Sequence, residues 1–363
     1  MKIAKTRTKE ISFFALYDKF IQDSKTGRRL QPNGKKIAPG TLANYVYTIN
    51  LLQKFCAAKN FTLRICIIKH LTKRQLITEK NYWKNFYKKF TSYLYSDCGH
   101  FDNYVGQNIK ILRVFFNYLQ KDLLIPVGDF HKSFYVRKED IPIITLLPEE
   151  LNHLIYNKTF EDSLDKKMQQ VKDVFVFGCT VALRISDLLV LSKNNLRITG
   201  DTWFLVVRSK KTHTDTQLRL PDYAIDILKK YKLKNNKLLP TFTNVSLNMN
   251  IKKLMELAGY TQPVGKIREQ QGRGKEIRFV KGNKTTVYRF CDLVTAHTMR
   301  RTAITVMLSL NVPEHVVRKI SGHSPMSKEF FRYVAVAQSY QDKEVSKMFE
   351  ILKERRLVNY KFI

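Results

Sequence analysis

Apolar residues at helical spacing dominate the first 120 residues, and this periodicity constrains the fold more than any other feature of the chain. One helix is expected to begin after Pro39-Gly40 with Thr41 as its N-cap, a second near residues 81–95 and a third over about 104–120. The apolar stripes are Leu42, Tyr45, Ile49, Leu52 and Phe55, then Trp83, Phe86, Phe90 and Tyr93, then Val105, Ile109, Leu112, Phe116 and Leu119. These stripes predict a helical first domain with an aromatic-rich core.

The second half mixes helices with short strands. The stretch FVFGCTVALRISDLLVL predicts a buried helix, a turn near residues 182–184 and another helix capped by Ser186 or Asp187. Residues 202–208 alternate as a strand and a second strand follows polar turn residues, so a β-hairpin is expected. Residues 261–291 are rich in Gly, Lys and Arg and predict an exposed basic loop or a second hairpin. Helices resume in AHTMRRTAITVMLSL and VPEHVVRKISG.

The length and a change in composition predict two domains. A chain of 363 residues can form two domains, and Pro126, Gly128 and Pro142 interrupt the helical periodicity between them. We expect a helical domain over residues 1–130, a linker over 131–145, a second domain over 146–340 and a C-terminal segment over 341–363. The expected fold class is mainly α, with a small antiparallel sheet in the second domain.

The charge balance points to a polyanionic partner. Lys and Arg number 64 against 31 Asp and Glu, a net charge of +33. A coding bias toward Lys accounts for part of this excess but not for the scarcity of acids, so nucleic acid is the favoured partner. An anionic membrane surface is the alternative, although no amphipathic anchor or lipidation signal supports it.

Other sequence features narrow the class of protein further. The chain has no run of about 18 apolar residues and no secretory signal, which argues against a membrane-spanning or secreted protein. Its five cysteines are scattered without a C-x-x-C pair, which indicates isolated thiols in a reducing cytoplasm rather than disulfides or a zinc site.

Side chains able to handle a phosphate are spread through the second half. Arg184 opens a helix among apolar residues, where its charge needs a partner such as Asp187. His297 and Arg300 are spaced i, i+3 and share a helix face, from which Arg301 points away. The remaining candidates are Lys210 and Lys211 at the hairpin tip, His323 after the helix-ending Gly322, and Tyr333. Taken singly, each of these residues also fits a structural ion pair or plain surface charge.

Taken together, these residue types suit one reaction. Arginines clamp phosphate oxygens with forked hydrogen bonds, histidines move protons, a lysine can protonate a leaving oxygen and a tyrosine can attack phosphorus. The sequence shows no carboxylate cluster of the kind that holds Mg²⁺ or Ca²⁺ in a nuclease. Metal-free transfer of a DNA phosphodiester therefore fits the candidates.

The order of these residues resembles the tyrosine recombinase (phage integrase) family. TVALRISDLLVL resembles the family's first arginine box, AHTMRRTAIT its second box, and KISGHSPMSKEFFRYVAV its final box with the nucleophile. Residues 36–120 are similar, more loosely, to the family's helical core-binding (SAM-like) domain. The H-T-x-R-R-T and I-S-G-H details resemble integrases of mobile elements in Bacteroidetes-type bacteria. The chain departs from the family at Val181-Ala182, where the family usually has Thr-Gly.

The resemblance implies a role for each matched residue. Tyr333 would attack the scissile phosphate and form a 3′-phosphotyrosyl link, with Tyr340 as the alternative nucleophile. Arg184 and Arg300 would stabilise the transition state. Lys211, or Lys210, would protonate the 5′-oxygen. His297 and His323 would assist by hydrogen bonding and proton transfer, and Asp187 would support the first arginine. No metal, ATP or other cofactor is implied.

The resemblance also implies how such a protein would act on DNA. We expect a C-shaped two-domain clamp of the DNA breaking-rejoining type, forming a homotetramer on two DNA duplexes in the bacterial cytoplasm, at the nucleoid. The residues after Tyr333 would dock on a neighbouring protomer or pack in cis. Lys84, Lys88, Lys210 and Arg301 are candidate DNA contacts, and DNA-bending or excision proteins are possible partners. The alternatives are a non-catalytic DNA-binding protein and a type IB topoisomerase.

Overall fold

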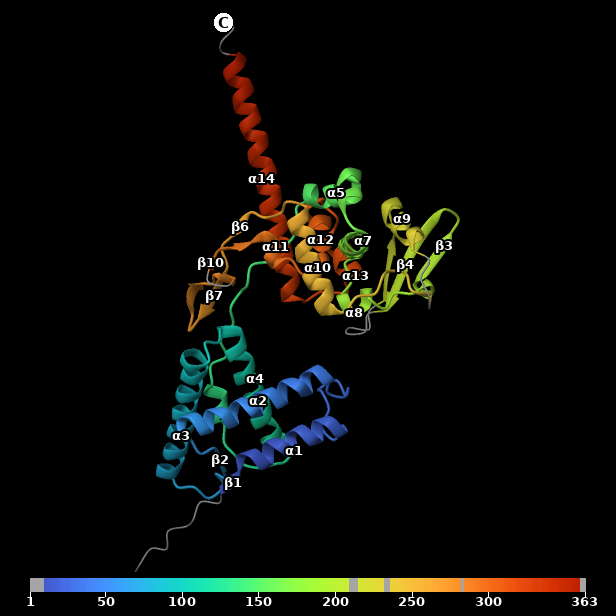
Figure 1. Cartoon of the computed structure of the whole chain (residues 1–363). Helices are drawn as coiled ribbons and strands as arrows, with labels where there is room; N and C mark the ends of the chain where they lie inside the picture. Colours follow the sequence, from blue (N-terminus) through green and yellow to red (C-terminus); the bar gives the residue numbers. More distant parts are fainter. Residues whose placement is uncertain (1–9, 209–214, 232–235, 282–283, 360–363) are drawn as a thin grey trace, which may run out of the picture. The chain divides into compact units, whose positions relative to one another are not determined.

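The computed structural model describes residues 10–208, 215–231, 236–281 and 284–359, and the chain divides into two compact units (Figure 1). Unit 1 contains the residues up to Ile141 together with Ile267–Ile277, and unit 2 contains Pro142–Lys266 and the residues from Arg278 onward. The chain therefore passes between the units three times. Of the helices in the described part of the chain, none combines the length and the apolar character needed to cross a bilayer.

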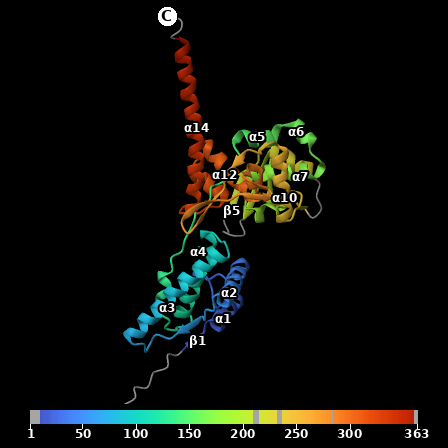
Figure 2. The ribbon, with the colours of Figure 1, turned by 60° about the vertical axis from the view of Figure 1, so that its left-hand side comes forward.

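Unit 1 is a helical bundle in which α1 and α2 run side by side (Figures 1 and 2). Strands β1 and β2 pair antiparallel, and so do β7 and β8. Its elements are β1 (Glu10–Ser12), α1 (Phe13–Thr26), α2 (Pro39–Lys59), β2 (Arg64–Cys66), α3 (Lys73–Ser92), the π-helix η1 (Tyr93–Asp97), α4 (Asp102–Lys121), the 3-10 helix η2 (Phe130–Ser133), β7 (Ile267–Gln270) and β8 (Arg273–Glu276).

The core of unit 1 is built from the predicted helical stripes. Every stripe position is buried except Leu42, which is partly buried and packs against the same core. Many of the core contacts join aromatic rings, such as the edge-on contact of Trp83 with Phe116 at 4.8 Å between centroids. The predicted N-cap Thr41 is wrong, because α2 begins at Pro39, whose fixed φ suits the first helical position.

Much of the stretch expected to be a linker is packed within unit 1. His131, Phe134 and Glu139 lie between residues 131 and 141 and are buried there. The His131 ring stacks on Phe116 at 5.2 Å between centroids, and its Nε2 lies 3.0 Å from Oδ1 of Asn117. The low hydrophobic periodicity of this stretch reflects its irregular backbone, from which these single side chains reach into unit 1 while most of their neighbours are exposed.

The burial of His131 predicts an acid-sensitive unit 1. Burial lowers the pKa of His131 to about 4, whereas in the unfolded chain it is near 6.5. Below pH 6.5 only the unfolded chain binds the proton, so the free energy of unfolding should fall by up to about 1.4 kcal/mol per pH unit down to about pH 4. Urea unfolding at pH 7, 6 and 5, followed by Trp83 fluorescence in a Trp203→Phe background, measures the slope. The same slope in a His131→Gln chain would contradict this assignment.

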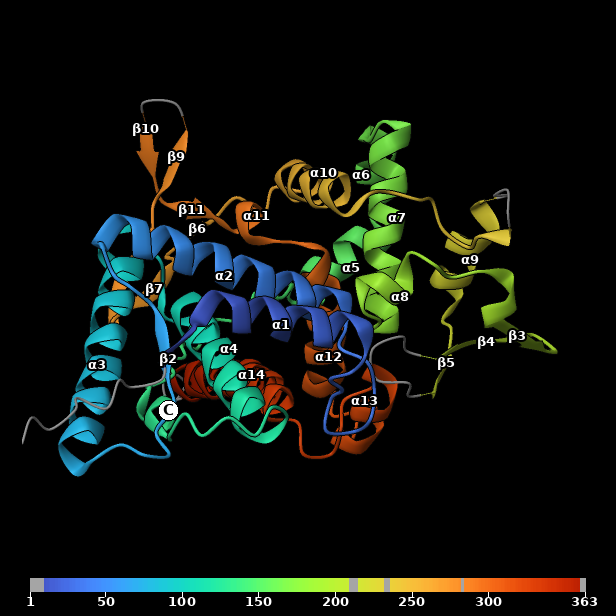
Figure 3. The ribbon, with the colours of Figure 1, turned by 90° about the horizontal axis from the view of Figure 1, so that it is seen from below.

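Unit 2 packs its helices around α7, with a three-stranded sheet of order β3-β4-β5 (Figure 3). Its N-terminal elements are α5 (Pro148–Tyr156), α6 (Lys158–Ser163), α7 (Lys166–Val181), α8 (Ile185–Leu188), the 3-10 helix η3 (Lys193–Asn195), β3 (Leu196–Thr199), β4 (Thr202–Arg208), β5 (Asp215–Arg219) and α9 (Asp222–Lys230). The later elements are α10 (Asn244–Leu257), β6 (Pro263–Val264), β9 (Phe279–Lys281), β10 (Lys284–Thr286), β11 (Tyr288–Arg289), α11 (Phe290–Leu293), α12 (Ala296–Ser309), α13 (Glu314–Ser321) and α14 (Lys328–Asn359).

Several local predictions for unit 2 can be compared with these elements. The hairpin of β4 and β5 is confirmed, and residues 261–291 form paired strands rather than a loop. The predicted helix cap is wrong, because Arg184 is the N-cap of α8 and Ser186 and Asp187 lie inside it. Helix α12 packs on α7, which is far from it in sequence, and on α14, which follows it after α13.

Candidate functional site

Arg300 lies at the centre of the candidate site in unit 2. It is on α12, buried, and its Nη1 donates a hydrogen bond to the carbonyl of Ala182 at 2.8 Å. Ala182 ends α7 with φ of +54°, a left-handed conformation that glycine adopts more readily. The departure from Thr-Gly at this point therefore leaves the left-handed turn in place, and the turn aims a carbonyl at Arg300.

Burial and neighbouring charges perturb Arg300. Its pKa is lowered to about 10, mainly by burial and next by the positive charge of Arg184, while Tyr333 and Asp187 oppose the shift. These three groups come from α8 and α14, so the fold brings both candidate arginines and the candidate nucleophile close to one another. A buried arginine beside a second positive charge is a site that favours binding of an anion.

His323 completes this cluster from the loop after α13. Its two ring nitrogens each lie 3.3 Å from Nη2 of Arg300, and its Nδ1 lies 2.8 Å from Oγ of Ser321. Because Ser321 Oγ donates to the carbonyl of Val317 at 2.6 Å, the serine accepts from Nδ1–H. The Nε2 of His323 is then the acceptor that faces Arg300.

Burial and the positive charges around His323 keep its ring neutral. Burial is the main cause that lowers its pKa to about 3, and the positive charges of Arg300, Arg184 and Arg318 act in the same direction, as does His297. Ser321 and Arg318 were not predicted as site residues from the sequence. The I-S-G-H motif contained the only signal for Ser321, since a serine two residues before the histidine can reach its Nδ1.

Tyr333 lies beside His323 on the first turns of α14. The two rings are 5.9 Å apart between centroids, and Tyr333 is 6% exposed among Ala303, Val317 and Phe330. Tyr340, the alternative nucleophile, instead shares a hydrogen bond of 2.8 Å with Thr145 Oγ1 and lines a different groove. Tyr333 therefore lies with the arginines and histidines, and Tyr340 does not line that cluster.

The other candidate residues are distributed over the two units. His297 is exposed on α12 and Asp187 is buried on α8, whereas Arg301 is partly buried and follows Arg300 on α12. Lys84 and Lys88 are exposed on α3 of unit 1. Lys210 and Lys211 lie outside the described residues.

Strand β5, which begins a few residues after these two lysines in the sequence, is bonded to α13. Thr216 Oγ1, on β5, donates to the carbonyl of Lys319 on α13 at 3.3 Å. Among the described residues, no group of three or more His, Cys, Asp or Glu side chains is arranged to hold a metal ion.

The chain matches one family model, described as the phage integrase family, over residues 146–339, which is more than half of its length. The chain belongs to the phage integrase family. This assignment makes it a tyrosine recombinase family enzyme, and the matched range contains every residue of the cluster around Arg300. A search of curated protein sequences finds no match.

Solved structures of the family share the fold of this integrase-family chain. XerH recombinase bound to difH in a pre-cleavage complex is 15% identical, with 87% of this chain and 81% of that chain covered and a TM-score of 0.51. A lambda integrase dimer bound to a COC′ core site is 11% identical, with coverages of 90% and 78% and a TM-score of 0.55. The Tn1549 transposon integrase with transposon right end DNA is 13% identical, with coverages of 91% and 99% and a TM-score of 0.53. The predicted mainly helical, two-domain fold with small antiparallel sheets is confirmed.

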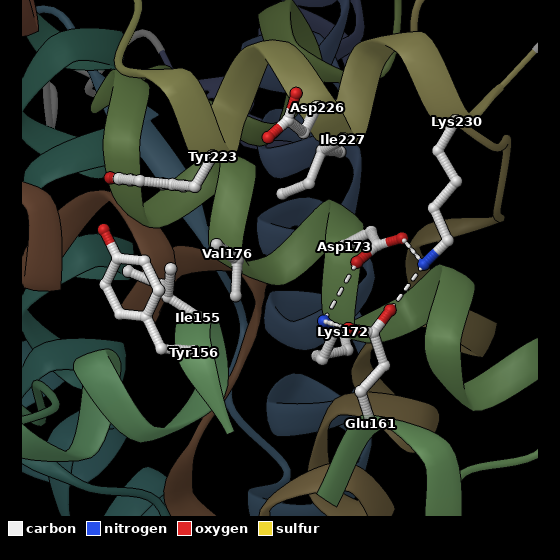
Figure 4. Close-up of a pocket in the computed structure, with 10 residues that line it drawn as sticks. All are labelled: Ile155, Tyr156, Glu161, Lys172, Asp173, Val176, Tyr223, Asp226, Ile227 and Lys230. Carbon is white, nitrogen blue, oxygen red and sulfur yellow. Dashed lines mark hydrogen bonds and ion pairs between the residues drawn. The ribbon is translucent and has the colours of Figure 1, made fainter. Parts of the chain in front are cut away.

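A separate cavity of about 260 Å³ in unit 2 contains a network of buried charges (Figure 4). Asp173 on α7 forms ion pairs with Lys172 at 3.3 Å and Lys230 at 2.9 Å, and it accepts a hydrogen bond from the Tyr231 hydroxyl at 2.6 Å. Glu161 joins the same lysines; burial alone would raise its pKa, but the hydrogen bond from Lys230 and the charge of Lys172 lower it to about 2. Because these charges are paired with one another across α6, α7 and α9, the network has a structural role.

Removing one acid from this network should destabilise unit 2. Asp173→Ala leaves the buried Lys172 with one acidic partner fewer, and the free energy of unfolding should fall by about 3–5 kcal/mol. Urea unfolding at pH 7 measures the change. Asp173→Ala combined with Lys172→Met removes the stranded charge, so it should recover most of the loss. Equal stability of the single and double variants would contradict this reading.

Proposed function

We propose that this chain is a site-specific DNA recombinase that cuts and rejoins strands through a 3′-phosphotyrosyl intermediate. The observation that carries the proposal is the cluster of Arg184, Arg300, His323 and Tyr333 around a buried left-handed turn, in a chain of the phage integrase family. Its biological role would be integration or excision of a mobile element, of the type found in Bacteroidetes. It would act in the cytoplasm, at the nucleoid.

The proposed reaction is a transesterification in which the number of phosphoester bonds is unchanged. The Tyr333 oxygen forms a bond to phosphorus, the bond from phosphorus to the 5′-oxygen breaks, and Lys211, or Lys210, gives that oxygen a proton. The tyrosine's proton passes to solvent or to a neighbouring histidine. A 5′-hydroxyl of a second strand reverses these steps, so the reaction needs no external energy source.

The two arginines supply the electrostatic part of this mechanism. Arg184 and Arg300 would bind the non-bridging oxygens, where charge develops in the transition state. Asp187 lies within the charge environment of Arg300 and would orient Arg184. His297 and His323 would add hydrogen bonds, and Ser321 would hold the His323 ring by its Nδ1. The bonds that hold Arg300 to the Ala182 carbonyl and His323 to Ser321 form without DNA, and such preorganisation makes charged groups effective in a transition state.

The burial of Tyr333 adds a conformational step to the proposal. With 6% of its surface exposed, its phenol has to leave its packing against Phe330 and Val317 before it meets a phosphate. The start of α14 follows directly on the loop that contains His323, so a phosphate bound there can displace the first turn of α14. We propose that DNA binding exposes the nucleophile.

Further parts of the proposal concern DNA contacts and assembly. Lys84 and Lys88 on α3, with Arg301 and Lys210, are proposed to contact DNA phosphates, because exposed lysines on one helix face can follow a DNA backbone. We propose a homotetramer on two duplexes in a C-shaped grip, with residues 341–363 docking on a neighbour and with accessory DNA-bending or excision proteins. The lambda integrase structure is of a dimer bound to a COC′ core site.

Covalent trapping tests the proposed function. A duplex selected from a random pool by binding to the purified chain is nicked near its centre, so that the cut fragment diffuses away and the adduct accumulates. The expected result is a covalent protein–DNA species whose digest contains DNA on the peptide with Tyr333. DNA binding without any adduct would instead support a non-catalytic DNA-binding protein, and plasmid relaxation without recombinant product would support a topoisomerase.

A further inference from the structure

The hairpin of β7 and β8 is part of unit 1, although the chain on either side of it belongs to unit 2. Ile267–Ile277 leaves unit 2 after Lys266 and returns to it at Arg278. Its two strands pair in register from Ile267 opposite Glu276 to Gln270 opposite Arg273. Strands β7 and β8 pair only with each other among the described strands, and they share no pairing with the sheet of β3, β4 and β5 (Figure 1).

The turn of this hairpin is held by one buried carboxylate. The backbone N–H groups of Gln271 and Gly272 donate to the two oxygens of Asp102, each at 2.8 Å, and the Tyr95 hydroxyl donates to Asp102 at 2.6 Å. Gln271 and Gly272 have φ of +58° and +77°, as a two-residue hairpin turn of the type I′ requires. Asp102 is 1% exposed, so these donors, rather than water, satisfy it.

A second buried carboxylate holds the β7 strand. Glu139 accepts from Nε and Nη2 of Arg268 at 2.9 and 2.6 Å and from the backbone N–H of Glu269 at 2.7 Å. Glu139 is 4% exposed, and its own backbone makes two hydrogen bonds of 3.1 Å with the amide of Asn103 on α4. The Gln270 amide donates to the carbonyls of Tyr95 and His100, each at 3.2 Å.

The docked hairpin supplies most of the hydrogen-bond donors for the two buried carboxylates of unit 1. Without it, Asp102 would keep only its bond from Tyr95, and Glu139 would lose its guanidinium and one backbone donor. Buried carboxylates that lose such donors are costly, so the docked state is strongly favoured. The chain also approaches closely here: a Cβ on Gly106 of α4 would lie 1.9 Å from the carbonyl oxygen of Arg137, which leaves room only for glycine.

The hairpin is connected by a short path to the candidate site. Strands β6 and β11 pair with each other in unit 2. Strand β6 precedes the segment that contains β7 and β8, and β11 follows it. From β11 the chain runs through α11 directly into α12, which bears His297 and Arg300. Contacts that hold the hairpin on unit 1 therefore lie on the same stretch of chain that leads through β11 and α11 into α12.

We propose that Asp102 and Glu139 are positioning residues that anchor the β7–β8 hairpin on unit 1, so that unit 1 and α12 engage one DNA duplex together. This inference rests on the proposed function, and it assigns to the hairpin the role of a second attachment besides the linker at Ile141. Two attachments restrict the freedom of the units more than one does, which raises the effective concentration of the second DNA-binding surface once the first is bound.

The first measurement tests the anchor itself in the full chain. In Asp102→Asn combined with Glu139→Gln, each carboxylate is replaced by an amide whose NH₂ group opposes a donor. Hydrogen exchange at the amides of Gln271 and Gly272 should become at least about 10-fold faster, and trypsin should cut faster at Arg268 and Arg273. Gln271→Pro makes the same test from the hairpin side, because it leaves the unit 1 carboxylates intact but removes one N–H and cannot adopt the required φ.

Asp122→Asn is the matched control, since it neutralises an exposed acid at the other end of α4 and should exchange like the wild type. Unchanged exchange in both anchor variants would overturn the anchor.

The second measurement tests positioning, at a temperature well below unfolding. Both anchor variants should bind the selected duplex about 10-fold more weakly and form the covalent adduct about 10-fold more slowly at saturating DNA. Wild-type affinity and rate together with fast exchange would overturn the positioning role. If the wild type forms no adduct, the proposed function fails, and the DNA affinity then decides: about 10-fold weaker binding supports the positioning role and unchanged binding overturns it.

Discussion

Tyr333→Phe is expected to abolish the covalent adduct on nicked DNA. The change removes only the phenolic oxygen, and the ring keeps its packing against Phe330 and its contact with His323. Loss of a covalent nucleophile typically lowers the rate by roughly 10⁴-fold or more, which places adduct formation below detection. The measurement is the yield of the protein–DNA species on a denaturing gel, together with the affinity for the uncut duplex, which should stay within about twofold.

Tyr340→Phe is the matched control for this experiment. It removes the same group from the same helix, but the hydroxyl it removes is bonded to Thr145 rather than placed in the Arg300 cluster. The adduct should form at the wild-type rate in this variant. An adduct that persists in Tyr333→Phe and disappears in Tyr340→Phe would refute the assignment of the nucleophile.

Arg300→Met is expected to slow adduct formation by about 10²–10³-fold, the usual cost of losing one preorganised donor to a transition state. Burial and the positive charge of Arg184 lower the pKa of Arg300. Keeping Arg300 charged therefore costs the folded chain free energy relative to the unfolded chain. We therefore expect the free energy of unfolding to stay unchanged or to rise, even though the contact with the Ala182 carbonyl is lost. Single-turnover cleavage and urea unfolding measure the two effects separately.

Slower cleavage without a loss of stability is the result expected for a charged residue that is retained for function. Arg197→Met on β3 is the control, because Arg197 is exposed and lies outside the cluster. It should leave both quantities near their wild-type values. A large loss of stability in Arg300→Met, with cleavage reduced only in proportion to the unfolded fraction, would show that Arg300 is structural.

The sequence predicted local structure where one physical pattern is repeated along the chain. The stripe that contains Trp83 and Phe86 recurs at helical spacing, and burial of that stripe is enough to define α3 and its inward face. Predictions of helix ends were weaker, since Thr41 and Ser186 are good caps that lie inside helices beginning at Pro39 and Ile185. The expected linker shows a related limit. Residues 131–141 have no helical periodicity, yet they belong to unit 1 and His131 is buried there.

By itself the sequence determined the periodic helices, the β4–β5 hairpin and the order of motif residues that indicated the family, because each of these is written in neighbouring positions. Only the tertiary structure decided that Ser321 orients His323, that Tyr333 rather than Tyr340 lies beside Arg300, and that a hairpin from the second half completes unit 1. The bond from the Gln271 N–H to Asp102 joins residues far apart along the chain. Such contacts depend on how whole elements pack in space, and neither residue alone gives any local signal of its partner.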